Sequence, residues 1–192
     1  MDCRKVGSLI RSLRTEKGMT QLMLAQRLDV SDRAVSKWER GEGCPDITLV
    51  ARLAGVLGVS TESILAGSLD TNGADGGNMK RIKFYVCPEC GNIVTATGTA
   101  DITCCGRKLE ALSAHPADDV HRLTVTDSGD EYYVTFSHEM TKRHYLCFIA
   151  YVACDRVCMV RLYPEQGGEL HFPKMYGGRF FTGCIRDGLF VQ

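Results

Sequence analysis

The sequence lacks an excess of charge, a long apolar run and a targeting segment. Its 23 Lys and Arg residues balance 23 Asp and Glu residues. This balance does not exclude DNA binding, because a nucleic acid binds to a local basic face and not to the whole chain. No apolar run approaches the roughly 18 residues of a membrane span, and the N-terminus does not resemble a signal peptide. We therefore expect no membrane association and a cytoplasmic location.

No internal repeat and no nucleotide or flavin motif is visible. The one glycine-rich stretch, residues 68–78, lacks the strand–loop–helix setting that a phosphate cradle needs. It has a single large apolar residue among many Gly, Asn and Asp, which predicts a flexible linker over 68–80. The first domain is therefore expected at 1–67.

The chain contains ten cysteines, a high count for 192 residues. Without a secretory signal, cysteines in close pairs indicate metal ligands or free thiols rather than disulfides. Five cysteines stand apart among apolar residues, and we expect them to be small buried hydrophobic side chains. These five are Cys3, Cys44, Cys147, Cys154 and Cys158.

Residues 4–65 are predicted to be helical throughout, in five segments. Apolar residues recur at helical spacing, and helix-stopping glycines stand at Gly18 and Gly58. Thr20, Ser31 and Asp46 each precede an apolar-periodic run and are suited to cap the helix that follows. The pattern indicates a small helical domain.

A more specific pattern runs through the same stretch. Its members are Thr20, Gln21, Leu24, Ala25, Val30, Ser31, Val35, Ser36, Lys37, Trp38, Glu39, Gly41, Pro45, Asp46, Leu57, Gly58, Val59 and Ser60. This pattern resembles the Xre/Cro-type (phage-repressor) helix-turn-helix family over nearly all of residues 4–66. The resemblance implies that the third helix enters the major groove of DNA. Trp38 is expected in the core.

The resemblance places the base-reading residues at Asp32, Arg33 and Lys37. Arg33 or Lys37 is suited to guanine, whereas Asp32 is suited either to cytosine or to capping the helix. The resemblance places Gln21, Ser36 and Arg40 where such domains contact phosphate. The full predicted DNA-binding set is Gln21, Ser31, Asp32, Arg33, Ser36, Lys37 and Arg40. The alternative is that these polar residues form an ordinary solvated face.

From Ile82 onward the sequence favours strands. The β-branched and aromatic runs, separated by turn residues, cover 83–86, 93–95, 122–126, 132–136, 145–153 and 157–163. Several short strands at this spacing predict an antiparallel sandwich or barrel. The expected fold class is therefore multidomain α + β.

Four cysteines in two turns can face one ion. Cys87 and Cys90 lie in a CxxCG motif, and Cys104 and Cys105 precede a glycine about a dozen residues later. Four thiolates make a closed tetrahedral site for iron or zinc, and the sequence does not choose between the metals. The alternative is a redox dithiol or unpaired surface cysteines. The segment resembles desulforedoxin, the rubredoxin-like opening domain of desulfoferrodoxins, which implies one bound iron and a domain at 81–113.

Residues 114–192 resemble the second desulfoferrodoxin domain, the superoxide reductase module. The residues that carry the resemblance are His121, His138, His144 and Cys184. It implies a mononuclear iron held by these residues and a fourth histidine, but Asp187 stands where that histidine is expected. Val120 replaces a lysine that the family places beside the iron. The site either survives, with Asp187 as a possible oxygen ligand, or has lost its metal; His115 and His171 match no ligand position.

The sequence thus predicts a DNA-binding transcriptional regulator whose C-terminal region, residues 81–192, senses metal or redox state. Its expected partner is a double-stranded operator, bound as a homodimer because such operators are usually paired half-sites. One alternative is a superoxide reductase that carries a DNA-binding head. Another is a zinc-stapled dimerisation module whose histidine site is empty.

Overall fold

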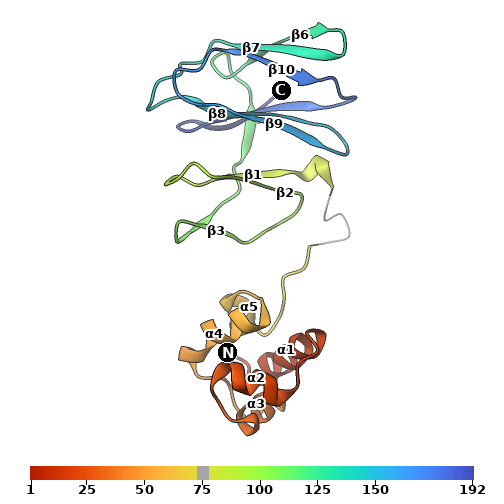
Figure 1. Ribbon diagram of the computed structural model, residues 1–192, viewed down its shortest axis with the longest axis vertical. Coiled ribbons are helices and arrows are strands. Elements are labelled where there is room, and N and C mark those ends of the chain that lie inside the picture. The colour runs from red at the N-terminus through yellow and green to blue at the C-terminus, as the bar shows by residue number, and fades with distance from the viewer. Residues whose placement is uncertain (73–77) are drawn as a thin grey trace. The chain divides into compact units, whose positions relative to one another are not determined.

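The computed structural model describes residues 1–72 and 78–192, which form two compact units, Met1–Thr71 and Asn72–Gln192 (Figure 1). We call them the head and the tail. Residues 73–77, part of the predicted linker, lie outside the described residues. Among the described helices, none is both long and apolar enough to cross a membrane.

The head consists of five helices, as predicted. They are α1 (Cys3–Glu16), α2 (Gln21–Leu28), α3 (Asp32–Glu39), α4 (Ile47–Leu57) and α5 (Thr61–Ala66). The predicted caps are confirmed: the side-chain oxygens of Thr20, Ser31 and Asp46 accept the backbone N–H groups of Met23, Ala34 and Thr48 at 3.1, 3.2 and 2.8 Å. Each cap satisfies a backbone donor that the helix leaves unpaired.

The core of the head is apolar and includes the side chain of Trp38, as predicted. Helix α1 approaches α3 closely at Gly7, where a β-carbon would lie only 1.9 Å from the backbone oxygen of Trp38. Asp29 adopts a left-handed conformation (φ 59°) between α2 and α3, a conformation that Asp tolerates. The turn therefore forms without the glycine usual in the family.

The tail begins with a short 3₁₀ turn and two small hairpins. Their elements are η1 (Met79–Arg81), β1 (Lys83–Val86), β2 (Ile93–Ala96), β3 (Ile102–Cys104) and β4 (Arg107–Leu109). Strands β1 and β2 form one antiparallel sheet and β3 and β4 another.

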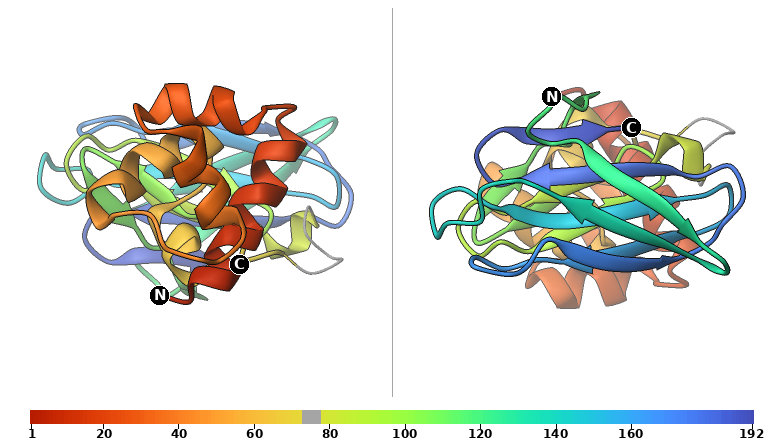
Figure 2. Two further views of the ribbon diagram at one scale, coloured as in Figure 1. Left: turned by 90° about the horizontal axis from the view of Figure 1, so that it is seen from below. Right: turned by 90° about the horizontal axis from the view of Figure 1, so that it is seen from above.

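The rest of the tail is a β-sandwich, which Figure 2 shows from above. Its strands are β5 (Ala114–Pro116), β6 (Leu123–Ser128), β7 (Glu131–Phe136), β8 (Leu146–Val152), β9 (Val157–Arg161), β10 (Glu169–Pro173), β11 (Arg179–Cys184) and β12 (Gly188–Val191). One sheet has the order β10-β7-β6 and the other β5-β12-β11-β8-β9. The predicted sandwich is confirmed, with one difference: β5 pairs parallel to β12.

The two parts of the tail share a core. The ring of Phe84 in β1 stacks on that of Phe148 in β8, with 5.1 Å between centroids. Both residues belong to one cluster with Phe181 and Leu189. The division expected between residues 113 and 114 is therefore not a boundary between compact units, because apolar faces on both sides of it are buried against each other.

The scattered cysteines differ from the prediction. Cys3 and Cys44 form a disulfide, and Cys154 is exposed, whereas Cys147 is buried as expected. Cys158 is half-buried. The prediction was wrong for the first pair because sequence spacing does not reveal that the start of α1 and the loop after α3 meet.

Candidate DNA-binding face and metal centres

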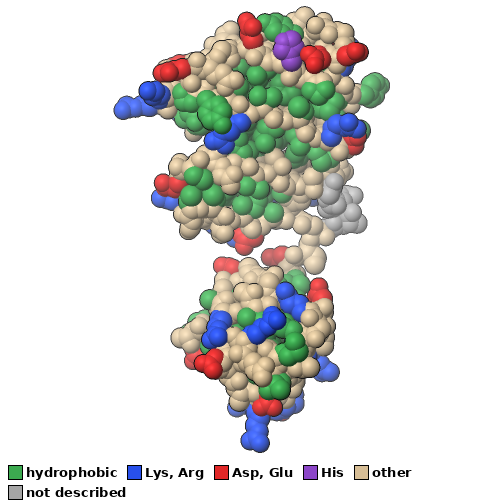
Figure 3. All heavy atoms as spheres, viewed as in Figure 1, with side chains coloured by type: hydrophobic (Ala, Val, Ile, Leu, Met, Phe, Trp, Pro, Cys, Tyr) green, Lys and Arg blue, Asp and Glu red, His purple; other side chains and the backbone are tan. Residues whose placement is uncertain are grey.

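Helix α3 presents the predicted base-reading residues to solvent. Asp32, Arg33 and Lys37 are exposed, while Val35 and Trp38 on the opposite side are buried. Figure 3 shows Lys and Arg side chains protruding at the end of the head that carries α3 in Figure 1. The face therefore combines exposed cationic groups with a rigid, capped helix.

The residues expected to contact phosphate have partners within the head. The guanidinium of Arg40 donates to the Glu42 carboxylate at 2.9 and 2.8 Å and also to the Ser36 hydroxyl. Gln21 Nε2 donates to Glu39 Oε2 at 2.8 Å. Ser31 caps α3 through its side chain. These bonds fix the side chains of Gln21, Ser31, Ser36 and Arg40 within the head.

A buried ion pair joins the first three helices. Arg14 Nε in α1 donates to Glu39 Oε1 in α3 at 2.6 Å, and Arg14 also bonds the backbone oxygen of Met19 at 2.6 Å. The Glu39 side chain is only 3 % exposed. Burial by itself raises the pKa of Glu39, but the hydrogen bonds from Arg14 and Gln21 outweigh it and lower that pKa. This pair is not evident from the sequence, because its members lie 25 residues apart.

The four grouped cysteines come together in the two hairpins. Cys87 follows β1, Cys90 precedes β2, and Cys104 and Cys105 lie at the turn between β3 and β4. Their sulfur atoms all lie within 4.8 Å of one another, and the Cys90–Cys104 distance is 3.6 Å. Around an ion with metal–sulfur bonds of about 2.3 Å, tetrahedral thiolates stand about 3.8 Å apart. The arrangement fits such an ion.

Backbone conformation shapes this cluster. Gly91 N–H donates to the Cys87 oxygen at 2.9 Å, and Cys105 has a positive φ of 50° that turns it toward the first pair. Arg161 in β9 donates to the Gly91 oxygen at 2.8 Å and so anchors the turn to the sandwich. The cluster is held by the tail as a whole.

The thiols influence one another electrostatically. Backbone hydrogen bonds, first from Cys90, lower the pKa of Cys87 to about 7. Hydrogen bonding to Cys90 and then to Cys87 and Cys104 raises the pKa of Cys105 to about 12. Several thiolates so close together repel one another, and a bound cation would relieve that repulsion.

The second cluster lies at one end of the sandwich. His121 precedes β6 and His138 follows β7, and these strand ends are paired through Leu123 and Phe136. The ends of β8, β11 and β12 bring the remaining members to the same place. Donor atoms of His121, His138, His144, Cys184 and Asp187 all lie within 4.8 Å of one another. The structure thus brings together all five residues singled out in the sequence.

Oxygen atoms of neighbouring residues face the Nδ1 atoms of the three imidazoles and so orient the rings. The Nδ1 atoms of His121 and His144 face Asp118 Oδ1 at 2.7 Å and Glu139 Oε2 at 3.2 Å, and that of His138 faces the Glu139 backbone oxygen. In His121 and His138, an acceptor at Nδ1 favours a ring whose Nε2 carries a lone pair, as in histidines that ligate metals. The Nε2 atoms of His121 and His138 are buried and have no hydrogen-bond partner in the part of the chain that the structure describes.

Asp187 reaches into the same space. Its Oδ2 lies 2.8 Å from His144 Nε2, 3.4 Å from His121 Nε2 and 3.6 Å from Cys184 Sγ. Burial by itself raises the pKa of Asp187, but the hydrogen bonds from His144 and Cys184 together outweigh it and lower that pKa. Burial raises the pKa of Cys184. Buried nitrogens without partners beside a carboxylate and a thiol form a donor set that fits a transition-metal ion.

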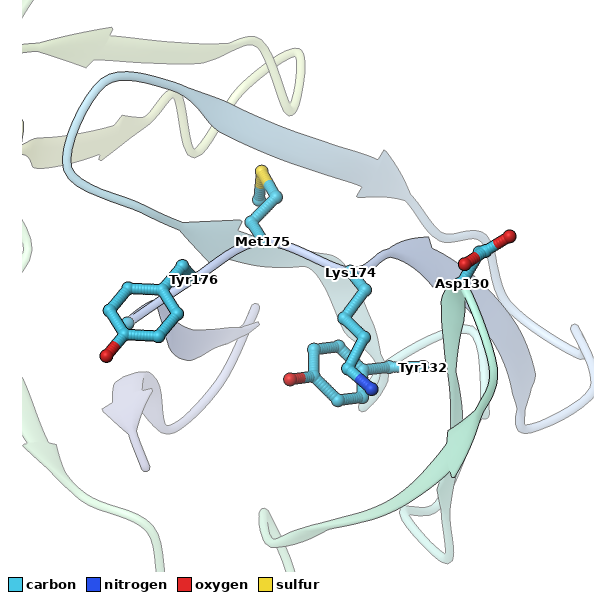
Figure 4. A pocket seen from close by; sticks show the side chains of 6 residues that line it. Asp130, Tyr132, Lys174, Met175 and Tyr176 are labelled. Carbon is cyan, nitrogen blue, oxygen red and sulfur yellow. The ribbon is translucent and has the colours of Figure 1, made fainter.

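The two remaining histidines and one cavity lie outside these two clusters. His115 is exposed on β5, and His171 is exposed and bonds Glu131 at 3.1 Å. A hollow of about 660 Å³ opens beside β7 (Figure 4). Its lining residues, which include Lys174 with its amino group 5.8 Å from the ring centre of Tyr132, belong to neither cluster.

A five-helix head with a capped, exposed third helix defines a helix-turn-helix DNA-binding module, and the tail is a β-sandwich with two groups of metal-ligating side chains. The helix-turn-helix family profile matches residues 10–64. An uncharacterised HTH-type transcriptional regulator of Sinorhizobium fredii is 39% identical over 72 residues, which are 37% of this chain and 94% of that protein. The chain belongs to the family of helix-turn-helix transcriptional regulators.

The tail has relatives of a different kind. Desulfoferrodoxin of Syntrophotalea carbinolica is 26% identical over 106 residues, which are 51% of this chain and 84% of that protein. The superoxide reductase of Treponema pallidum has the same fold, with a TM-score of 0.50 and 18% identity over 58% of this chain and 97% of that one. A helix-turn-helix head is thus joined to a desulfoferrodoxin-like tail, as the sequence predicted.

Proposed function

We propose that the chain is a sequence-specific DNA-binding regulator whose tail binds metal and makes DNA binding depend on metal or redox state. The observation that most supports the tail's part is the pair of buried Nε2 atoms of His121 and His138, which have no hydrogen-bond partner among the described residues. Leaving such atoms unpaired costs free energy, which a bound ion would offset. The protein would act in the cytoplasm as a homodimer on paired half-sites.

For the head, we assign Asp32, Arg33 and Lys37 to base edges, and Gln21, Ser31, Ser36 and Arg40 to the DNA backbone. The support is that the first three are exposed on one capped helix. Of the other four, Ser31 and Arg40 cap the two ends of α3, Ser36 lies within α3 and bonds Arg40, and Gln21 begins α2.

Replacement of Arg33 by Ala is expected to weaken binding to the preferred sequence by roughly 10- to 100-fold, the order of about 1–3 kcal/mol for a lost bidentate base contact. A duplex selected from a randomised library with the full chain serves as the probe, and affinity is measured by fluorescence anisotropy at fixed salt. Arg52→Ala, which removes an exposed arginine from α4, is the matched control. Equal losses of affinity in the two variants would mean that Arg33 contributes only non-specific electrostatic attraction to DNA.

For the tail, we assign one iron or zinc ion to Cys87, Cys90, Cys104 and Cys105. A second, mononuclear iron is assigned to His121, His138, His144 and Cys184, with Asp187 as a fifth donor. Closed tetrathiolate sites are typically structural, whereas iron bound through a thiolate is redox-active. Asp118 and Glu139 would orient the imidazoles toward the ion.

The sensing hypothesis predicts that affinity for the selected duplex differs between metal-loaded reduced, metal-loaded oxidised and metal-free protein. Metal content and the visible spectrum are recorded on the same samples, prepared without oxygen and then exposed to air. Two metals per chain, with thiolate-to-iron bands that change on oxidation, would support redox sensing. Unchanged affinity across the three forms would refute it.

A superoxide reductase is the second candidate, favoured by the clustering of three histidines and a cysteine. The loop before His121 argues against efficient turnover: Val120 is 52 % exposed and uncharged, and Asp118 and Asp119 directly precede it. Negative charge there repels an anionic substrate. We expect slow superoxide reduction in stopped-flow measurements; rates near the diffusion limit would favour the enzyme.

A further inference from the structure

The head contains a covalent bond that neither its fold nor the metal clusters explain. Cys3 and Cys44 are joined as a disulfide across 41 residues, with their Cα atoms 5.0 Å apart, while the other eight cysteines are free thiols. That separation is within the range of ordinary disulfides. Both residues are only half-buried, so small redox reagents can reach the sulfur atoms.

The bond ties the start of α1 to the loop between α3 and α4. Cys3 is the first residue of α1, and Cys44 lies three residues beyond Gly41. Gly41 itself packs against Arg4, because a β-carbon there would lie 2.8 Å from Arg4 Cγ. The loop is therefore held against α1 both by packing and by the disulfide.

The same loop touches two of the side chains assigned to DNA. Glu42 binds the Arg40 guanidinium at 2.9 and 2.8 Å. Gly43 lies against Lys37, since a β-carbon there would be 3.3 Å from Lys37 Cε. A change in the loop thus acts directly on Arg40 and Lys37, without involving the tail.

We propose that Cys3 and Cys44 are a thiol–disulfide redox site within the head, and that the oxidised form fixes the loop for DNA binding. The proposal rests on the DNA-binding function proposed above. In oxidation by a peroxide, the two thiols lose two electrons and two protons as the S–S bond forms. Hydrogen peroxide accepts both, its O–O bond breaks, and two water molecules leave. In reduction by a small dithiol, a thiolate attacks the S–S bond and the reagent leaves as its own disulfide.

The redox state of the pair is tested by alkylation and mass spectrometry on the full chain. After treatment with hydrogen peroxide we expect the peptides of Cys3 and Cys44 to be protected from iodoacetamide, and after dithiothreitol to be labelled. Reduction should lower the melting temperature of the head by about 10 °C or more, because it releases a long closed loop in the unfolded chain. Full labelling of both cysteines after peroxide treatment would overturn the proposal.

The double variant Cys3→Ser/Cys44→Ser separates this site from the metal clusters, and Cys154→Ser, which removes an exposed tail thiol, is the control. With a duplex selected by the oxidised full chain, we expect reduction to weaken binding about tenfold in the wild type and in the control, the order of one lost charge-assisted contact. The double variant should lose this tenfold difference, and any change in affinity that remains in it on reduction belongs to the metal clusters of the tail.

Equal affinity of oxidised and reduced wild type would also overturn the proposal. If neither form binds any selected duplex, the proposed DNA-binding function fails. Alkylation and melting would then still show whether the pair is a redox site, so the two failures can be told apart.

Discussion

Replacing Glu39 with Ala is expected to destabilise the head by about 3–5 kcal/mol, since it leaves the Arg14 guanidinium buried without its partner. The Glu39 carboxylate accepts from Arg14 at 2.6 and 3.0 Å and from Gln21 at 2.8 Å. Loss of the carboxylate therefore removes the hydrogen bonds that join α3 to both α1 and α2. Chemical denaturation of the full chain, followed by the fluorescence of the single Trp38 beside this pair, measures the effect.

The exposed pair of Arg40 and Glu42 is the matched control. Glu42→Ala should change stability much less than Glu39→Ala, because an ion pair in water gains little over its hydrated charges. A similar loss in both variants would mean that burial of the Arg14–Glu39 pair is not what makes it important.

Acid gives an independent check on Glu39. Its pKa is lowered in the folded protein, so its stabilising contribution is fully present above the ordinary carboxyl pKa. That contribution is lost as the pH falls through the lower, folded-state pKa. Acid should therefore destabilise the wild-type head more than the head of the Glu39→Gln variant, which has no carboxyl group to protonate at this position.

The second large effect is expected at the four-cysteine cluster. Cys90→Ser should lower metal affinity at that site by at least about 100-fold, because loss of a ligand costs no less than loss of a residue that merely orients one. Cys90 is exposed, so the substitution leaves no cavity in the core. Elemental analysis of the purified full chain should show one metal fewer than in the wild type.

Thermal melting of the tail tests whether that ion is structural. A chelator should lower the melting temperature of the wild-type tail and have little further effect on Cys90→Ser, since metal binding energy becomes folding energy in small metal domains. Cys154→Ser, an exposed thiol outside both clusters, should behave as wild type. Equal metal content in the two variants would contradict the assignment of Cys90 as a ligand.

Much of the head could be predicted from local signals. The caps at Thr20, Ser31 and Asp46 and the left-handed residues Asp29 and Gly58 lie where the sequence placed them. Each depends on a backbone preference within a few residues, and such preferences are readable in a short window. The strands from β10 to β12 were not predicted: Gly177 and Gly178 directly precede β11 and Gly188 begins β12, and such glycines weaken the sequence signal of a strand.

The candidate sites likewise combine residues that the sequence identifies with positions that only the tertiary structure determines. The residues of the histidine cluster were singled out by resemblance to a family, but no local rule places His121 beside Asp187. Their proximity depends on the register of β6 with β7 and of β8 with β11 and β12. The hydrogen bonds that occupy the Nδ1 atoms of His121 and His138, and leave their Nε2 atoms without a hydrogen bond among the described residues, follow from that packing.

By itself, the sequence determined the five helices, their caps, the exposed face of α3 and the two closely spaced pairs of cysteines, since these depend on residues near one another along the chain. Only the tertiary structure decided that Cys3 bonds Cys44, that Arg14 pairs with Glu39 and that the small hairpins share a core with the sandwich. These contacts join residues many positions apart. They exist because burial of apolar faces brings distant elements together, and that is a property of the folded chain as a whole.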